Sequence, residues 1–341
     1  MRRINAIGYY GWDNFGDELF RAAIQRNREL LWGPGARVRS FITPVPALHQ
    51  NLGVLGRATR LIEAIIGAVW CDTIALCGGS VLEDVRGTQR TRSGAFRKRR
   101  SIEGIGISLG PWATPAAKER VRDYVAKMDR VVVRDIASRG RIGTDVTVGG
   151  DLAALYPMPI VPASQREYLT ICVSNDSKES VDDVVEFFSR LLPSVDMPVK
   201  LLALNVRPRL GDVEFAQEIH RRLNAYHPDI ELHRYETIDQ TIALIASSQA
   251  VWSQRLHGLI VAYLCDVPIL ALSHHRKISD FSAHIGLPAR FLCESLVFDE
   301  AIGLAARESL TGIRAWAITP SEYKEATRAA FDMTRAPVMR E

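Results

Sequence analysis

The sequence predicts an α/β protein with two Rossmann-like domains whose parallel sheets face a cleft. Short apolar runs typical of strands alternate with helical patterns along nearly the whole chain. A proline-rich segment interrupts this alternation near the middle of the 341 residues. A domain size of roughly 150 residues also favours two domains over one.

The first half of the chain, residues 1–156, is the expected N-terminal Rossmann-like domain. Its expected strands are residues 4–10, 38–42, 73–77, 102–109, 130–134 and 145–148. Helical patterns begin at about Asp17, near residue 61 and at Thr114-Pro115. Threonine followed by proline is typical of a helix start, because threonine caps the first turn and proline fits its first position.

Residues 157–164 are the expected linker, because Pro157, Pro159 and Pro162 disfavour both helix and interior strand. Residues 165–341 are the expected second Rossmann-like domain. Its expected strands are residues 168–173, 199–204, 230–234, 250–253 and 267–272. Helices are expected up to residue 192, over 213–226 and 239–247, from 256 and from about 277. A C-terminal packing helix is expected after residue 299, with a frayed tail.

The composition is that of an ordinary globular protein, with 47% hydrophobic and 24% charged residues. The apolar stretches 61–70 and 259–265 are too short to cross a bilayer. The first three residues lead directly into a strand pattern, so we expect no secretory signal and a cytoplasmic location. The five cysteines form no C-x-x-C pair and are expected to be buried thiols.

The net charge of +4 is too small to argue for nucleic-acid binding. Basic residues cluster locally at Arg86, Arg90, Arg92, Arg97, Lys98, Arg99 and Arg100. This cluster is either a solvated loop or a contact with an acidic glycan, a lipid diphosphate or an anionic membrane surface. The composition leaves both interpretations open.

Three distant stretches each follow an apolar strand pattern: residues 8–18, 133–135 and 254–258. Polar residues that follow parallel strands lie at the carboxyl edge of a sheet, where open α/β folds bind ligands. Two arginines, a histidine and an acidic pair at such edges suit an anionic substrate and acid/base chemistry. The sequence therefore predicts an enzyme.

Each of these residue types also has a simpler structural interpretation. Arg134 could pair with its neighbour Asp135, and a lone histidine is usually structural. Asp17 and Glu18 could merely complement the positive end of a helix. The glycines of the first loop match neither a dinucleotide fingerprint nor a P-loop, so a nucleotide role is unsupported.

Five blocks in order resemble the polysaccharide pyruvyl transferases: GYYGWDNFGDE at 8–18, GGSVLED at 78–84, GIGISLG at 104–110, VVVRD at 131–135 and RLHGLIVAYLCDVPILALSHHRKISDF at 255–281. The resemblance implies a fold like that of GT-B glycosyltransferases. It also implies transfer of the enolpyruvyl unit of phosphoenolpyruvate onto two hydroxyls of one sugar, which yields a pyruvate ketal and phosphate.

With this resemblance, the residues receive expected roles. The catalytic candidates are His257, Asp17 and Glu18. The donor-binding candidates are Arg134, Arg255, Leu256, Gly258 and Lys277, with the amides of residues 256–258 expected to be available to phosphate. The acceptor-binding candidates, assigned to the N-terminal domain, are Tyr10, Asp13, Asn14, Gly79, Ser80 and Asp84. Ser80 departs from the family, whose members commonly have a third glycine there.

The expected partners are phosphoenolpyruvate as co-substrate and a glycan or lipid-linked oligosaccharide acceptor, with peripheral contact at the inner face of a membrane. No cofactor, metal or nucleic acid is expected. The adjacent His274 and His275 make a poor metal pair. His49, His220, His227, His233 and His284 carry no motif and are expected on the surface or in packing. The alternatives are a GT-B glycosyltransferase that uses a nucleotide sugar and a non-enzymatic glycan- or phosphate-binding protein.

Overall fold

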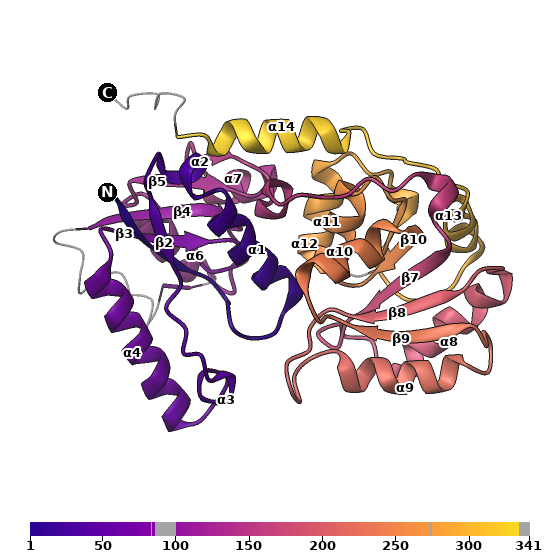
Figure 1. The fold of residues 1–341 in the computed structure, drawn as a ribbon. Helices are drawn as coiled ribbons and strands as arrows, with labels where there is room; N and C mark the ends of the chain where they lie inside the picture. The colour runs from indigo at the N-terminus through magenta and orange to yellow at the C-terminus, as the bar shows by residue number, and fades with distance from the viewer. Residues whose placement is uncertain (83, 86–99, 273–274, 334–341) are drawn as a thin grey trace. The chain divides into compact units, whose positions relative to one another are not determined.

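The computed structural model describes residues 1–82, 84–85, 100–272 and 275–333. Contacts divide the chain into two compact units, each with a six-stranded parallel sheet (Figure 1). The expected α/β class with two Rossmann-like units is therefore confirmed. The basic residues from Arg86 to Arg99, like His274, lie outside the described residues.

The sheet of the first unit has the strand order β2-β1-β3-β4-β5-β6. Its strands are β1 (Arg3–Ile7), β2 (Arg37–Arg39), β3 (Thr73–Cys77), β4 (Ser101–Ile107), β5 (Arg130–Val133) and β6 (Thr147–Val148). The chain runs from β1 outward to β2 and then returns to place β3 on the other side of β1. The carboxyl ends of β1 and β3 thus form a topological switch point, where open sheets bind ligands.

The described helices of the first half are α1 (Phe15–Arg26), α2 (Arg28–Trp32), α3 (Pro46–His49), α4 (Val54–Trp70), α6 (Pro115–Val125) and α7 (Ile136–Ile142). The expected start at Thr114-Pro115 is confirmed, because the Thr114 side chain accepts a hydrogen bond from the amide of Ala117. The core beneath them contains Ile4, Phe20 and Ile105, all fully or almost fully buried.

The sheet of the second unit has the order β12-β11-β10-β7-β8-β9. Its strands are β7 (Tyr168–Val173), β8 (Val199–Ala203), β9 (Ile230–Arg234), β10 (Ser248–Ser253), β11 (Ile269–Leu272) and β12 (Leu292–Cys293). Its helices are α8 (Val181–Leu191), α9 (Val213–Leu223), α10 (Ile238–Ala246), α11 (Leu256–Leu264), α12 (Arg276–His284) and α13 (Glu300–Leu310), followed by α14 (Pro320–Phe331). Here β7 and β10 form the switch point, since the chain runs outward from β7 to β9 and then returns to β10.

The division into units differs from the expected domains at two places. Asp13–Gly16 belongs to the second unit, although residues on both sides of it belong to the first. Helix α14 begins in the second unit, but its residues from Lys324 onward belong to the first. The reason is the fully buried ring of Phe331, which lies in the core of the first unit, where its backbone carbonyl accepts a hydrogen bond from Arg130.

Element boundaries differ by a few residues from the expected ones. Strand β1 ends at Ile7 instead of residue 10, because the glycine-rich segment that follows turns away from the sheet. The short elements α2, α3 and β12 were not predicted, since two to five residues carry too little periodicity to be recognised.

Candidate active site

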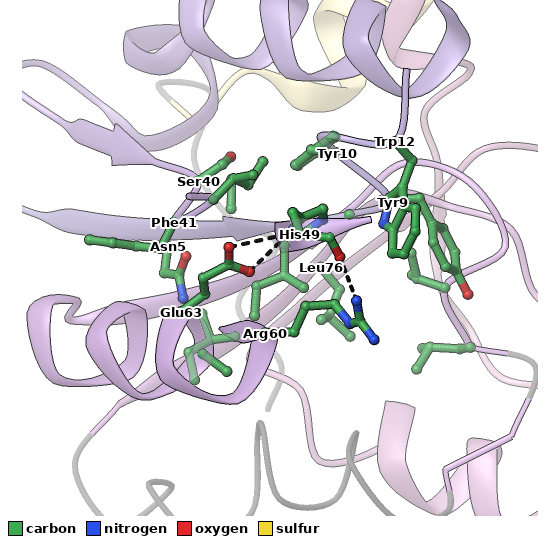
Figure 2. Close-up of a pocket in the computed structure, with 18 of the residues that line it drawn as sticks. Asn5, Tyr9, Tyr10, Trp12, Ser40, Phe41, His49, Arg60, Glu63 and Leu76 are labelled. Carbon is green, nitrogen blue, oxygen red and sulfur yellow. Dashed lines mark hydrogen bonds and ion pairs between the residues drawn. The ribbon is translucent and has the colours of Figure 1, made fainter. Parts of the chain in front are cut away.

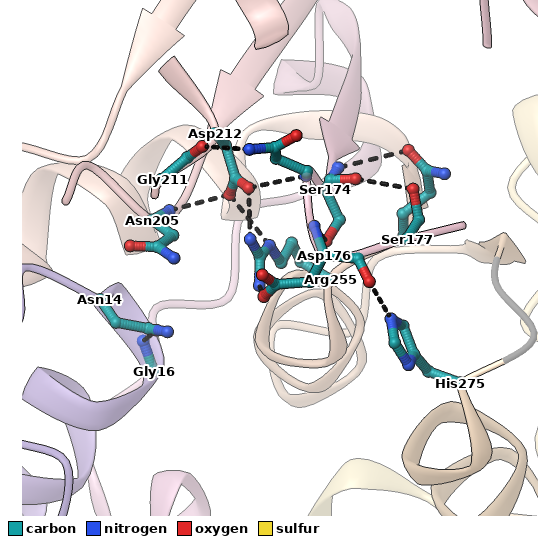
Figure 3. Close-up of polar contacts among 12 residues, drawn as sticks. Asn14, Gly16, Ser174, Asp176, Ser177, Asn205, Gly211, Asp212, Arg255 and His275 are labelled. Atoms are coloured by element: carbon teal, nitrogen blue, oxygen red, sulfur yellow. Dashed lines mark hydrogen bonds and ion pairs between the residues drawn. The ribbon is translucent and has the colours of Figure 1, made fainter. Parts of the chain in front are cut away.

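The switch point of the second sheet gathers the polar residues that follow β7 and β10 (Figure 3). The backbone amide of Gln254 donates to the carbonyl of Cys172 at 2.8 Å. The Gln254 side-chain oxygen in turn accepts a hydrogen bond from the amide of Ser174 at 3.3 Å. Residues after the two neighbouring strands are therefore held together at one edge of the sheet.

Gln254 and Arg255 connect β10 to helix α11, and Arg255 directly precedes the helix. Ser253 Oγ accepts from the Arg255 amide at 3.0 Å and donates to the Arg255 carbonyl at 2.8 Å, which holds this turn in place. Residue 258, which packs against this turn, must be glycine, because a Cβ at Gly258 would lie 2.5 Å from Ser253 Oγ. The Gly258 amide donates to the Arg255 carbonyl at 3.1 Å. The expectation that this amide would be available to phosphate is therefore wrong.

The guanidinium of Arg255 lies between two carboxylates. Its Nε donates to Asp212 Oδ2 at 2.9 Å and its Nη2 to Asp212 Oδ1, which makes a bidentate pair. Its Nη1 donates to Asp176 Oδ2 at 2.5 Å. Burial by itself would lower the pKa of Arg255, but the two carboxylates outweigh burial and raise it. Arg255 is therefore permanently charged, and each of its three nitrogens has an acidic partner.

The two acidic partners differ in exposure. The Asp212 side chain is 0% exposed, whereas that of Asp176 is 57% exposed. Asp212 also accepts from the amides of Asn175 and Asn205, both at 3.0 Å. Asp212 is thus a structural anchor for the guanidinium, and Asp176 is its solvent-exposed partner.

A tight loop presents Asp212 to the site. The Asp212 amide donates to the carbonyl of Asn205 at 2.6 Å. A Cβ at Gly211 would lie 2.4 Å from the same carbonyl, so glycine is the residue that fits there. Asp212 precedes α9, yet its side chain makes no capping hydrogen bond to that helix. It is directed instead to Arg255.

The segment Asp13–Gly16 pairs with the strand extension after β8. The Phe15 amide donates to the Leu204 carbonyl at 2.9 Å, and the Val206 amide donates to the Asp13 carbonyl at 2.9 Å. Asn14 and Asn205, both labelled in Figure 3, form an antiparallel bridge. Residues 13–16 thereby pair with the segment whose Asn205 amide donates to Asp212.

His257 lies against this segment. A Cβ built at Gly16 would come within 1.9 Å of His257 Nδ1, so the imidazole packs directly on the glycine backbone. The Gly16 amide donates to Asn14 Oδ1 at 3.1 Å, which shapes the turn beneath the ring. Of the first glycine loop, residues 13–16 therefore meet His257 within the second unit.

The third stretch lies in the first unit. Arg134 has a side chain only 5% exposed, with Nε 3.3 Å from Asp135 Oδ2 and Nη1 3.8 Å from Asp151 Oδ2. Burial would raise the pKa of Asp135, but Arg134 and the hydrogen bonds of Ser138 outweigh it and lower the pKa. The ion pair with Asp135, which is the structural interpretation of Arg134, is therefore present. Its donor-binding role stays a prediction.

The acidic pair of the first loop has structural contacts within the first unit. Glu18 Oε1 accepts from the Gly11 amide at 2.6 Å, and Glu18 Oε2 lies 3.2 Å from Arg21 Nη1. Asp17 Oδ1 lies 3.9 Å from the Cβ position of Gly79, so the loops after β1 and β3 are neighbours. The catalytic roles of Asp17 and Glu18 stay predictions.

The acceptor candidates of the first unit are spread over both loops. The Tyr10 ring is buried, and its hydroxyl donates to the Cys77 carbonyl at 3.2 Å. Asp84 makes a bidentate ion pair with Arg120 at 2.8 and 2.9 Å. Ser80 is half-buried beside Gly79. In the second unit, Lys277 lies exposed in the first turn of α12, and Leu256 begins α11.

Within the described part of the chain, no three histidine, cysteine or acidic side chains are grouped to hold a metal ion. All five cysteines are buried and free, as expected. Among the described helices, none is both long and apolar enough to cross a membrane.

Sequence reasoning missed Asp212 and Asp176, and it gave no role to Gln254 although this residue lies in the stretch 254–258. Asp212 precedes a helical pattern, so its sequence context indicates only a helix cap. Asp176 lies in a polar loop with no motif. Gln254 is 2% exposed, and its side-chain nitrogen has no hydrogen-bond partner among the described residues. Its position next to Arg255 was the one available signal.

Solved structures that bind UDP or UDP-sugars share this fold. S. aureus MnaA, in a co-structure with UDP, is 13% identical, with 97% of this chain and 92% of that chain covered and a TM-score of 0.59. The UDP-GlcNAc 2-epimerase of Neisseria meningitidis, bound to UDP-GlcNAc, is 12% identical, with 96% of this chain and 98% of that chain covered and a TM-score of 0.61. At these identities the likeness shows a GT-B fold and no shared activity.

The class of protein is therefore a GT-B-fold protein with a polar site at the switch point of its second sheet. A sequence model of the family described as polysaccharide pyruvyl transferase matches residues 14–276. The chain belongs to the polysaccharide pyruvyl transferase family. No curated protein sequence matches it.

Proposed function

We propose that this protein transfers the enolpyruvyl unit of phosphoenolpyruvate onto two hydroxyls of one sugar in a polysaccharide or its lipid-linked precursor. Membership of the family supports the transferase class. The observation that carries the donor assignment is the placement of Arg255 and His257 at the switch point of the second sheet. An arginine that stays charged and an imidazole are the groups that an anionic donor and proton transfer require.

The reaction needs protons at defined atoms. The methylene carbon of phosphoenolpyruvate accepts a proton and becomes a methyl group, while the oxygen of one hydroxyl bonds to the central carbon and loses its proton. The second hydroxyl forms the other carbon–oxygen bond, and phosphate leaves with the remaining proton. In our proposal His257 exchanges these protons, since an imidazole can act in both directions near neutral pH.

Arg255 would bind the donor by exchange of partners. The exposed Asp176 is the partner that can leave, because exposed ion pairs contribute only about 0–1 kcal/mol. The buried Asp212, held by two amides, would stay in place and keep the guanidinium oriented. A carboxylate or phosphate of phosphoenolpyruvate would then occupy the position of Asp176 on Nη1.

Calorimetry with phosphoenolpyruvate, without added divalent metal, tests the donor. Thermal unfolding with UDP and UDP-sugars is measured beside it, because a ligand of the folded state raises the melting temperature. We expect stabilisation by phosphoenolpyruvate and release of phosphate only with a pyranose acceptor. Stabilisation by nucleotide sugars alone would favour a nucleotide-sugar transferase instead.

A further inference from the structure

A cavity of about 260 Å³ lies within the first unit, between helix α4 and the strands β1 and β3 (Figure 2). The loops after β1, β2 and β3, with His49 of α3 and Tyr124 of α6, line its remaining sides. Tyr9, which is 51% exposed, contributes to the lining, so the cavity reaches the surface there. Since a cavity of about 150 Å³ holds benzene, this one has room for one substituted six-membered ring.

A histidine–carboxylate pair lines this cavity. His49 Nδ1 lies 3.0 Å from Glu63 Oε2 and 3.2 Å from Glu63 Oε1, and both side chains are largely buried. Glu63 Oε1 also accepts from the amide of Thr43 at 2.7 Å, which holds the carboxylate in place. With Nδ1–H donating to Glu63, the neutral imidazole has Nε2 as its acceptor atom.

Two buried polar atoms in the lining lack hydrogen bonds. His49 Nε2 and Ser40 Oγ have no hydrogen-bond partner among the residues that the structure describes. Buried polar atoms left unsatisfied cost folding free energy, and native proteins rarely keep them without a purpose. One atom is an acceptor and the other a hydroxyl that can donate or accept, so together they suit the hydroxyls of a ligand.

The surroundings of His49 are aromatic and carry no net charge. Trp12 packs on its ring with centroids 5.1 Å apart, and Arg60 lies 5.4 Å above the Trp12 ring. Arg60 Nη1 donates to the carbonyls of His49 and Asn51, so it ties the end of α3 to α4. The charges of Arg60 and Glu63 cancel, which favours a neutral ligand over an anionic one.

We infer that this cavity binds one neutral pyranose ring, with a sugar hydroxyl donating to His49 Nε2 and another contacting Ser40 Oγ. Aromatic side chains supply the apolar surface that the ring's C–H groups need, as in most small-ligand sites. Glu63 is a positioning residue, because it sets the tautomer of His49. The inference rests on the proposed function only in that the bound sugar is the acceptor.

Saturation-transfer NMR with methyl glucoside, methyl galactoside and methyl mannoside, without phosphoenolpyruvate, tests the site. We expect transfer to at least one pyranoside, with a dissociation constant raised about tenfold or more in His49→Ala and Ser40→Ala. His233→Ala, which removes a half-buried histidine that pairs with Glu231 in the second unit, is the matched control and should bind like the wild type. Thermal unfolding shows which variants remain folded.

The ¹⁵N resonances of His49 provide a second measurement. In the wild type we expect Nε2 to be the unprotonated nitrogen and to shift when the pyranoside binds. Glu63→Gln should mix the tautomers and weaken sugar binding, a result that a purely structural carboxylate would not produce. Absence of binding by all three pyranosides, or equal affinity in wild type, His49→Ala and Ser40→Ala, overturns the inference.

The two proposals fail separately. Pyranoside binding without any binding of phosphoenolpyruvate would contradict the proposed function and leave the sugar site standing. Phosphoenolpyruvate binding with no pyranoside signal would contradict the sugar site alone.

Discussion

The imidazole of His257 rests on the backbone of Gly16, with Nδ1 1.9 Å from the position that a Cβ would take. The two residues are 241 positions apart in the sequence. Any side chain at residue 16 would push the ring from its position. The glycine therefore defines where the proposed proton-transfer group can be.

Gly16→Ala should lower turnover about tenfold or more, because the ring of His257 must move and a misplaced acid/base group loses most of its effect. Phosphoenolpyruvate affinity should change less than turnover. Steady-state kinetics and calorimetry measure the two effects. Gly140→Ala is the matched control, since a Cβ there meets nothing within 4 Å, and its turnover should equal that of the wild type.

His257→Ala should retain folding and most donor affinity while turnover falls by roughly a hundredfold or more. His257→Gln should be equally slow, because an amide can replace a hydrogen bond but cannot shuttle a proton. Phosphate release and ketal formation are measured together with a pyranose acceptor. Near wild-type rates in His257→Gln would assign proton transfer to another group, with Asp17 and Glu18 the next candidates.

The two partners of Arg255 should respond differently to neutralisation. Asp176→Asn removes an exposed competitor for the donor, so phosphoenolpyruvate should bind at least as tightly, with stability changed by less than about 1 kcal/mol. Asp212→Asn removes the buried anchor and should cost about 3 kcal/mol of stability. Calorimetry and urea unfolding give both quantities. Weaker donor binding in Asp176→Asn would contradict the exchange of partners.

Arg255→Ala should weaken phosphoenolpyruvate binding by about 2–4 kcal/mol, as expected when a charged partner in a desolvated site is lost. Arg134→Ala separates the donor role of Arg134 from its ion pair with Asp135. A donor role requires a similar loss of affinity, whereas a structural role lowers only the free energy of unfolding. Calorimetry on the folded variants decides, and unchanged affinity in both would remove the two arginines from the donor site.

Asp151 should make stability depend on pH. Burial raises its pKa from 3.8 to about 6, although Arg134 acts in the opposite direction. Between these two pH values, Asp151 is ionised in the unfolded chain but stays protonated in the folded protein. The free energy of unfolding therefore falls as the pH rises through this window. A shift of about 2 units at 1.36 kcal/mol each corresponds to about 3 kcal/mol.

Asp151→Asn removes this ionisation. The free energy of unfolding of Asp151→Asn minus that of the wild type should therefore increase by about 3 kcal/mol as the pH rises from 4 to 7. Urea unfolding at several pH values measures the difference. Parallel stability curves for the two proteins would contradict the assignment.

Long periodic segments made the fold class readable from the sequence. Strand β7 is buried along its whole length and β10 at all but one residue, and such burial on both faces is typical of parallel sheets. The glycine and histidine of the RLHG block also follow from local patterns, since residues after such strands lie at the sheet edge. Short elements such as α3 carried no such pattern, and His49 was therefore assigned no function.

The sequence by itself determined the alternation of strands and helices, the family resemblance and the residue types at the strand ends. Only the tertiary structure decided their partners: Asp212 with Arg255, Gly16 with His257 and Glu63 with His49. The physical reason is that the periodicity of a sequence segment reflects which residues of its own helix or strand are buried, and this is a local property. Ion pairs and ring contacts depend on which distant loops the strand order brings to the same edge.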